Sequence, residues 1–360
     1  MQRSDLLLMT DKLYKLTDAT KVVVRNTTEE EVSSEVPWLD YSALTEYSYC
    51  LVNGLLKNHL QKSAFGEGGG RRMALEAGSA AHEVFAAHRI HSLKTRGLDD
   101  HFTYHGLRLF GERRFNGMLE FVDDQQSFAL EALYNSGFTD DPDDKRRTTG
   151  NIEEACIIYM QSYNSGEFPV WVEDESNAES RVGIEIPVDM TVEFHFEDEV
   201  MSNRIVGKVD GIHTNSDGEI VLNENKTASR MDMSWQMAFG LSHQLSVYAL
   251  AMSTYLGKAV ELVDVYGITI PTPRSGNLGG YLRIPEVRTS KHFNDFLVWL
   301  LHNSQMRDFY GDDVENAPRS TNSCSRFFST CEFINYCNAQ DFDRADVLEQ
   351  MSDATWHPHN

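Results

Sequence analysis

The chain of 360 residues is long enough for two ordinary domains or one large elaborated domain. Apolar residues make up 41% of it and charged residues 24%, a globular composition that excludes a disordered or fibrous chain. Its 55 acidic and 32 basic residues give a net charge of −23, which argues against nucleic acid unless a local basic channel exists. No apolar run approaches membrane-spanning length and the run near Met1 is too short for a signal peptide, so we expect a soluble, cytoplasmic protein with no membrane partner.

The N-terminal part of the chain predicts a lead-in followed by two helices. Residues 1–40 end in the acidic run TTEEEVSSEVPW and predict an irregular segment with at most a short strand at KVVV. A helix capped by Ser42 is predicted next, with Tyr47, Cys50 and Leu51 at three- to four-residue spacing. After the glycine-rich loop FGEGGGRR, the segment MALEAGSAAHEVFAAHRI predicts a second helix that contains His82. Its small residues suit close packing against a sheet.

The remainder predicts a helical insertion and then a sheet. Residues 95–180 carry predicted helices at QSFALEALYNSG and IEEACIIYMQSYNSG, and Cys156 in the latter is predicted to be a buried core thiol. Residues 182–196, RIVGKVDGIHT and EIVLNENKT predict a three-stranded meander with an Asn-Ser-Asp-Gly turn. A long helix over 233–255, strands at VELVDVYGITI and YLRIPEVRT, and a late helix at HFNDFLVWLLHNSQMRDFY complete the pattern.

Two carboxylates and a lysine lie in the second and third strands of this meander. Asp210 lies in GKVDGI, and Glu224 and Lys226 lie in LNENK. Glu224 and Lys226 share one face of their strand, and a turn centred on Ser216 and Asp217 can place Asp210 beside them. Such oxygen ligands suit Mg²⁺ or Mn²⁺, and a nearby lysine can orient or deprotonate a water that attacks a phosphodiester. The alternative is a salt bridge on a solvated sheet edge, but both segments follow apolar runs, where charges are costly.

Six elements follow one another along the chain: Cys50, GSAAHE around His82, GKVDGI with Asp210, ENK with Glu224 and Lys226, QLSVY with Gln244 and Tyr248, and three cysteines near the end. This ordered set resembles the PD-(D/E)xK nuclease superfamily, and within it the iron-sulfur RecB/AddB-like branch that includes CRISPR-associated exonucleases and phage relatives. The resemblance runs from about Ser42 to Cys337. It implies an α/β restriction-endonuclease-like core with a mixed central sheet flanked by helices, a helical insertion, and termini joined by an iron-sulfur cluster.

The resemblance also implies roles for the residues of the meander and its neighbours. His82, Asp210 and Glu224 would be ligands of a divalent metal. The main-chain carbonyl of Asn225 would be a further ligand of this metal. Lys226 would position the attacking water. Taken alone, His82 would more simply be a structural helix histidine.

Three further side chains are candidates for the same site. Gln244 and Tyr248 are four residues apart on a predicted helix and therefore share a face. In the family this pair borders the active site and is thought to support the lysine or contact DNA, while the alternative is the polar edge of an amphipathic helix. Glu185, on the preceding strand, is either a neighbour of the metal or an exposed strand carboxylate.

Four of the five cysteines form a second predicted site. The odd total favours metal ligation over disulfides in a chain without a secretion signal. Cys324, Cys331 and Cys337 are separated by six and five residues, which is not the paired Cys-x-x-Cys spacing of most zinc sites. The resemblance implies that Cys50 supplies the fourth thiolate of a 4Fe-4S cluster, although the six-residue gap departs from the commoner family spacing. We expect a structural role for the cluster, with redox sensing as the alternative.

The predicted nucleic-acid contacts are Arg71, Arg72 and Tyr248. Clustered bases elsewhere, which solvated loop charge explains equally well, are Arg113, Arg114, Lys145, Arg146 and Arg147. Phe65, Tyr248 and Phe327 could stack on bases of a single strand. The acidic net charge predicts weak, salt-sensitive binding or dependence on a basic recombination or replication protein.

These patterns predict a lead-in at 1–40, a nuclease domain at 41–337 and a tail at 338–360, with the insertion at 95–180 and the iron-sulfur module at 324–337 with Cys50. The predicted activity is metal-dependent hydrolysis of DNA phosphodiesters. The family resemblance favours single-strand exonuclease activity, often from the 5′ end, over structure-specific endonuclease activity, in recombination, repair or phage replication within a bacterial or phage-infected cell. Two alternatives are a nuclease-fold iron-sulfur protein that binds nucleic acid or a partner without cleaving, and an iron-sulfur or zinc protein with no nucleic-acid role.

Overall fold

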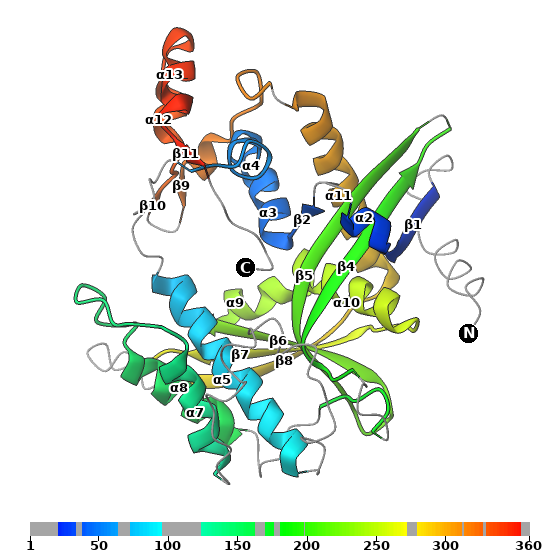
Figure 1. Ribbon diagram of the computed structural model, residues 1–360, viewed down its shortest axis with the longest axis vertical. Coiled ribbons are helices and arrows are strands. Elements are labelled where there is room, and N and C mark those ends of the chain that lie inside the picture. The colour runs from blue at the N-terminus through cyan, green and yellow to red at the C-terminus, as the bar shows by residue number, and fades with distance from the viewer. Residues whose placement is uncertain are drawn as a thin grey trace. The chain divides into compact units, whose positions relative to one another are not determined.

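The computed structural model describes residues 21–33, 38–63, 73–95, 124–162, 170–175, 181–197, 199–271, 279–311, 313–326 and 329–353. The protein is a mixed α/β structure with a central, mostly antiparallel sheet flanked by helices (Figure 1). Its internal contacts define two compact units. The first comprises Met1–Arg71, Asp189–Gly207 and Phe293–Asn360, and the second comprises Arg72–Val188 and Lys208–His292. Within the described ranges, no helix has both the length and the apolar character needed to cross a membrane.

The first unit contains β-structure at the edge of the sheet. Strand β1 (Lys21–Asn26) pairs antiparallel with the second half of β4 (Ile184–His195), and β2 (Trp38–Leu39) pairs parallel with the first half of β5 (Val200–Thr214). The short strand predicted at KVVV is therefore confirmed, with Val22 and Val24 buried.

Most helices of the first unit belong to its N-terminal and C-terminal segments. The N-terminal elements are α2 (Glu29–Ser33), α3 (Tyr41–Tyr49), α4 (Leu51–Gly54), a π-helical turn (Leu55–His59) and β3 (Lys62–Ser63). The C-terminal elements are α11 (Ser290–Tyr310), which begins just before the unit, two 3₁₀ turns (Thr321–Ser323 and Asp341–Asp343), β9 (Ser325–Arg326), β10 (Ser329–Thr330), α12 (Ile334–Asn338), α13 (Arg344–Glu349) and β11 (Ser352–Asp353). Strand β11 pairs antiparallel with β3, so the last described residues of the chain pair with the segment that follows the π-helical turn.

The predicted helix around Cys50 is interrupted, and its predicted cap is wrong. Asp40, not Ser42, caps α3, because its Oδ1 accepts the N–H of Ala43 at 2.6 Å. The chain then becomes extended at Cys50, between α3 and α4. Cys50 therefore lies at a helix break, where its side chain is not confined to the helix surface.

The second unit contains the remaining sheet. Strands β5 and β6 (Ile220–Ala228) form an antiparallel hairpin, β6 pairs parallel with β7 (Leu262–Thr269), and β7 pairs antiparallel with β8 (Gly280–Val287). The predicted meander of β4, β5 and β6 and the predicted mixed sheet are confirmed. At the hairpin turn, Oδ1 of Asn215 accepts the N–H groups of Asp217 and Glu219, and Gly218 has a φ of +80°, which favours glycine.

Helix α5 (Met73–Thr95) lies across this sheet (Figure 1). Helix α7 (Gln125–Asn135) packs on α5, and α8 (Thr149–Ser162) contacts α5, α7 and the strands β7 and β8. All three helices were predicted. Alanines at 77, 80, 81, 86 and 87 are buried in a core shared with α7, α8 and the β7 residues Tyr266 and Ile268. These short side chains let α5 approach the sheet closely, and Cys156 on α8 is fully buried in the same core, as predicted.

The long helix predicted over 233–255 is broken in the structure. It forms α9 (Met233–Ala238), a 3₁₀ turn (Phe239–Leu241) and α10 (His243–Leu256), with Ser242 extended and capping α10. Buried Arg288 donates to the carbonyl oxygens of Phe239 and Ser242 at 3.0 and 3.3 Å. These bonds add a second donor to two carbonyls at the break, which also accept the N–H groups of Ser242 and Ser246.

Candidate functional site

The β5–β6 hairpin brings the two predicted carboxylates together. Gly211 is paired with Asn223 across the hairpin. Asp210 and Glu224 are the next residues on the two strands, so they lie opposite each other just beyond this pair. Oδ2 of Asp210 accepts the main-chain N–H of Asn225 at 2.6 Å, which ties the carboxylate to β6. The predicted proximity of these residues is therefore observed.

Helix α5 contacts Asp210 through two side chains that lie seven residues, or about two turns, apart on one face. Nδ1 of His82 donates to Oδ1 of Asp210 at 3.2 Å. Arg89, which is 1% exposed, donates from Nη1 to the main-chain oxygen of Asp210 at 2.5 Å and from Nη2 to Oδ1 of Asn225 at 3.3 Å. The helix thus fixes both the carboxylate and the backbone of Asp210.

The charges around Asp210 shift its pKa and that of His82. Burial acts to raise the pKa of Asp210, but the His82 ring, the N–H of Asn225 and the Arg89 charge outweigh it and hold that pKa well below its usual range. Burial acts to lower the pKa of His82, and the adjacent Asp210 carboxylate, with the charges of Glu185 and Glu224, raises it instead.

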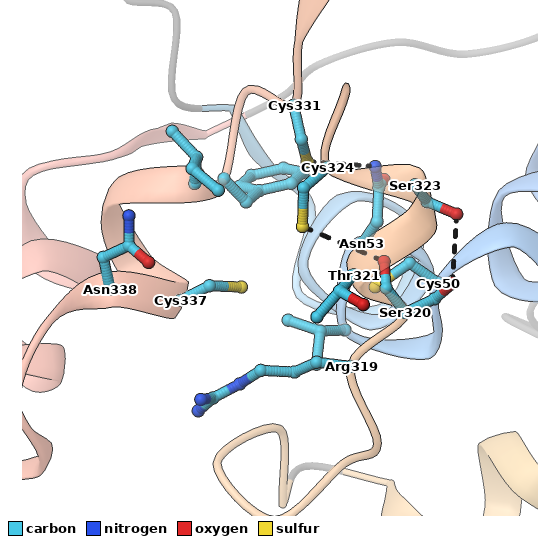
Figure 2. Close-up of a pocket in the computed structure, with 13 residues that line it drawn as sticks. Cys50, Asn53, Arg319, Ser320, Thr321, Ser323, Cys324, Cys331, Cys337 and Asn338 are labelled. Carbon is cyan, nitrogen blue, oxygen red and sulfur yellow. Dashed lines mark hydrogen bonds between the residues drawn. The ribbon is translucent and has the colours of Figure 1, made fainter. Parts of the chain in front are cut away.

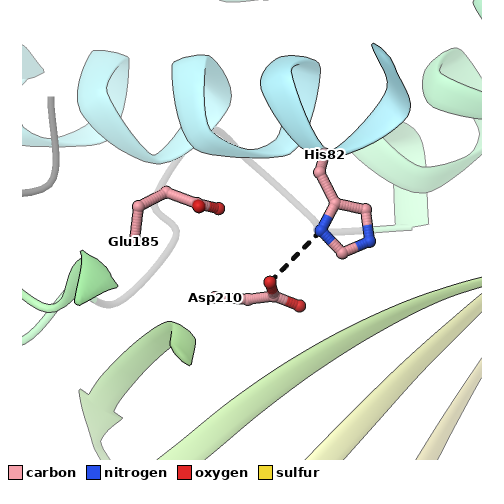
Figure 3. A group of neighbouring side chains, drawn as sticks. All are labelled: His82, Glu185 and Asp210. Atoms are coloured by element: carbon pink, nitrogen blue, oxygen red, sulfur yellow. Dashed lines mark hydrogen bonds and ion pairs between the residues drawn. The ribbon is translucent and has the colours of Figure 1, made fainter. Parts of the chain in front are cut away.

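Glu185 joins His82 and Asp210 in a cluster of possible ligand atoms. One such atom from each residue lies within 4.8 Å of the others (Figure 3). Glu185 lies on β4, is 1% exposed, and has a φ of +48°, a strained value for a residue with a Cβ. Oε2 of Glu185 is 2.5 Å from Nζ of Lys208, and burial raises the pKa of its carboxyl group. The sequence placed Glu185 only as a neighbour or an exposed carboxylate, and the structure buries it beside the other two.

Glu224 and Lys226 form an ion pair on one face of β6. Nζ of Lys226 is 2.6 Å from Oε1 of Glu224 and donates to Oε1 of Gln244, at the start of α10, at 2.9 Å. Burial raises the pKa of Glu224 to about 7 despite the neighbouring Lys226. Oε2 of Glu224 is buried with no hydrogen-bond partner among the described residues. Glu224 lies outside the His82, Glu185 and Asp210 cluster in this structure.

The remaining predicted residues are placed less directly at the site. Tyr248 lies one turn beyond Gln244 on α10 and is half-buried, and its catalytic or DNA-contacting role stays a prediction. Arg71, Arg72, Arg113, Arg114, Phe65 and Phe327 lie outside the described residues. In the acidic loop, Arg147 donates to Oδ2 of Asp144 at 2.7 Å, a local ion pair that a structural role explains.

The four predicted cluster cysteines line one cavity of about 200 Å³ in the first unit (Figure 2). Cys50, Cys324, Cys331 and Cys337 are all free thiols and half-buried. The N–H of Cys331 donates to the carbonyl of Cys324 at 2.8 Å, and Nδ2 of Asn53 is 3.7 Å from the sulfur of Cys331. The structure therefore brings together residues that are up to 287 positions apart in sequence, from Cys50 to Cys337.

The environment of two of these thiols, Cys331 and Cys337, disfavours their ionisation. Burial raises the pKa of Cys337 to about 11, with neighbouring cysteine thiols adding to the effect of burial against the charge of Arg319. Burial and the thiols of Cys50 and Cys324 also raise the pKa of Cys331. A bound cation would reverse this preference, because thiolates are the form that ligates metal.

Two residues that contact Asp210 and Glu185 were absent from the sequence interpretation. Arg89 could have been found from its position two turns after His82 on the same helix face. Lys208 could have been found from strand alternation, because it lies two residues before Asp210 and so on the same face of β5.

No protein-family model matches the chain. A search of curated proteins also finds no match. Among solved structures, the chain is similar to one described as "Crystal structure of SSO0001", with 16% sequence identity over 65% of this chain and 81% of that one and a TM-score of 0.29.

Proposed function

We propose that the chain is a divalent-metal-dependent deoxyribonuclease of the PD-(D/E)xK superfamily, iron-sulfur branch, that hydrolyses single-stranded DNA as an exonuclease, preferentially from the 5′ end. The observation that carries the proposal is the convergence of His82, Asp210, Glu224, Lys226 and Gln244 in the second unit. They come from α5, β5, β6 and α10. Recombination, repair or phage replication is the proposed setting.

The donor set supports a divalent cation. Glu224 has a buried oxygen without a hydrogen-bond partner among the described residues, and its pKa of about 7 shows that nearby positive charge does not compensate for its burial. Carboxylate and carbonyl oxygens suit Mg²⁺ or Mn²⁺, and the ring of His82 adds one nitrogen donor. His82, Asp210, Glu224 and the carbonyl of Asn225 would hold the ion, with Glu185 as a further carboxylate donor. An ion held there would polarise the phosphoryl oxygen and lower the pKa of a bound water.

The protein's own groups supply orientation and charge for the reaction. Glu224 and Gln244 hold the ammonium of Lys226 from two sides, at 2.6 and 2.9 Å, which restricts its position. In that position the ammonium can hydrogen-bond the attacking water and stabilise the negative charge that develops on phosphorus-bound oxygen. Arg89 holds Asp210 and Asn225 in place from α5.

The four thiols support a 4Fe-4S cluster as the second proposed cofactor. They share a single cavity, remain unpaired, and have an amide donor from Asn53 beside the sulfur of Cys331. The cluster would link the helix break at Cys50 to the chain at 324–337 and so stabilise the first unit. Buried Cys156 offers a matched control.

The first experiment measures cleavage of end-labelled single-stranded DNA with Mn²⁺ or Mg²⁺ after anaerobic purification. We expect wild type to cut and Lys226→Ala to lose at least about a hundredfold in rate, as expected when a group that acts on the attacking water is removed. The 5′ or 3′ position of the label reports polarity. A wild-type protein that binds the strand without cutting would favour the alternative of a non-cleaving nuclease-fold protein.

A second experiment tests the cluster separately. Anaerobically purified wild type should contain iron and sulfide and absorb visible light, Cys331→Ser should lose both, and Cys156→Ser should keep both. Equal iron content in all three proteins would contradict the assignment of the ligands.

A further inference from the structure

A second lysine, Lys208, lies beside the carboxylates of the site and has no role in the proposed reaction. Lys208 lies on β5, two residues before Asp210, and its Nζ is 2.5 Å from Oε2 of buried Glu185. Glu185 in turn contributes to the cluster with His82 and Asp210, whose ligand atoms lie within 4.8 Å of one another. Lys208 therefore contacts a carboxylate that would help to hold the metal.

The three cations beside the carboxylates differ in how far they reach solvent. The side chain of Lys208 is 43% exposed, against 30% for Lys226. Arg89 is 1% exposed and donates to main-chain and amide oxygens inside the protein. Lys226 is held by Glu224 and Gln244. A phosphate approaching from solvent would therefore meet Lys208 more readily than the other two.

Binding of a divalent ion would change the charge that surrounds the ammonium group of Lys208. Without an ion, its ammonium offsets the charge of Glu185, which is buried and would otherwise be costly to ionise. A divalent ion among His82, Asp210 and Glu185 would take over that compensation. It would also repel the ammonium, so the flexible lysine side chain, already partly in solvent, would turn outward.

From this geometry we infer that Lys208 is a substrate-binding residue that exchanges Glu185 for a backbone phosphate of the nucleic-acid strand when the metal binds. The inference rests on the proposed nuclease function and deepens it. It assigns Lys208 to phosphate binding, in contrast to Lys226, which acts at the attacking water. It also couples the two ligands, because the metal must bind for the lysine to become available to the strand.

The test compares Lys208→Met and Lys208→Arg with Lys258→Met, a matched removal of an exposed lysine after α10. Binding of a fluorescent single-stranded oligonucleotide is measured with Ca²⁺, across a series of salt concentrations, and Mn²⁺ binding is measured by calorimetry without DNA. We expect Lys208→Met to weaken strand binding about tenfold and to lower the slope of log affinity against log salt by about 0.7, the value of one single-strand phosphate contact. Its Mn²⁺ affinity should stay at the wild-type value or rise, and Lys208→Arg should keep the wild-type salt slope.

Kinetics give an independent readout. With cleavable substrate, Lys208→Met should raise KM about tenfold while kcat stays within about threefold of wild type, because the lost contact is equally present before and during the reaction. Lys226→Ala should instead lower kcat.

Three outcomes would overturn the inference in distinguishable ways. If Lys208→Met and Lys258→Met have the same salt slope, Lys208 does not touch a phosphate. If Lys208→Met loses Mn²⁺ and DNA binding together, Lys208 serves only to hold Glu185 in place. If wild type itself binds no strand with any divalent ion, the proposed function fails and this inference fails with it.

Discussion

Replacing Gly211 by alanine tests how α5 holds the backbone of Asp210. A Cβ on Gly211 would lie 2.6 Å from Nη1 of Arg89 and 3.0 Å from the carbonyl oxygen of Gly183. The carbonyl oxygen of Gly183 accepts the N–H of Ile212, and this hydrogen bond restrains the backbone of Gly183. The guanidinium of Arg89 must therefore move to make room for the methyl group.

The cost has two parts that can be read from the structure. Adding a methyl group to a well-packed interior destabilises by about 1–3 kcal/mol. Moving Arg89 also removes the donor that lies 2.5 Å from the carbonyl of Asp210, and a buried acceptor left unsatisfied costs about another 1–3 kcal/mol. We expect Gly211→Ala to lower the free energy of unfolding by about 2–6 kcal/mol.

The assay is urea unfolding followed by circular dichroism, with Gly240→Ala as the matched control. Gly240 lies in the 3₁₀ turn Phe239–Leu241, and a Cβ there meets no described atom within 4 Å. Its replacement should change the free energy of unfolding by less than about 0.5 kcal/mol. If the two alanine variants unfold at the same urea concentration, Arg89 does not occupy the place described here, and α5 does not hold Asp210 through it.

Three further predictions concern a helix cap, a buried histidine and the divalent ion. Asp40→Ala should lower the free energy of unfolding by about 1 kcal/mol, because it removes the acceptor for the N–H of Ala43. Replacing exposed Ser42 by alanine should have little effect. Equal losses in urea unfolding would contradict the assigned cap. Burial lowers the pKa of His88 from 6.5 to about 3, so the unfolded chain binds more protons between these values. The stability contributed by neutral His88 is complete above pH 6.5 and is lost as the pH falls toward 3. From pH 7.5 to 5.0 the loss is about 2 kcal/mol, and His88→Gln should remove that part of the pH dependence of urea unfolding; parallel profiles would refute it. Chelation of divalent ions should weaken binding of single-stranded DNA at constant ionic strength, measured by fluorescence anisotropy, and unchanged binding would separate strand recognition from the metal site.

Local patterns along the chain predicted most of the second unit. The alternation in GKVDGI and LNENK and the turn residues between them place Asp210 opposite Glu224, because strand register follows from turn length and side-chain alternation. The helical spacing of α5 and its alanines likewise predicted a helix packed closely on the sheet. The structure shows this arrangement, with the fold at the level of a mixed α/β protein.

The break between α9 and α10 could not be predicted from the same patterns. Apolar Met233, Met237 and Leu241 continue a helical spacing through the break, yet all three are exposed in the structure. The groups that favour the break include the guanidinium of Arg288, which is 46 residues beyond Ser242 in sequence. No window of local sequence contains that contact. Ser242 itself was the available signal, because it is a favoured cap residue.

Contacts remote in sequence also determine the composition of the carboxylate cluster. Glu185 shares a cluster with His82, although the two lie on different elements and are separated by the insertion. Sequence spacing emphasised Glu224 as a ligand, since Asp210 and Glu224 face each other in the hairpin. The structure pairs Glu224 with Lys226 and also puts Glu185 beside His82 and Asp210. The position of Glu185 reflects packing of α5 and β4 around β5, which periodicity does not encode.

The net charge of −23 does not describe the charge at the site, because it is summed over the entire chain. Around the cluster, the cations Lys208, Lys226 and Arg89 lie beside buried Glu185, Asp210 and Glu224. A divalent ion added there would make the site more positive. Exposed charges farther away than about 8–10 Å are largely screened at physiological salt, so the acidic remainder opposes a phosphodiester only weakly at contact. The acidic composition is therefore compatible with a DNA-binding site, on the condition that a divalent ion is bound first.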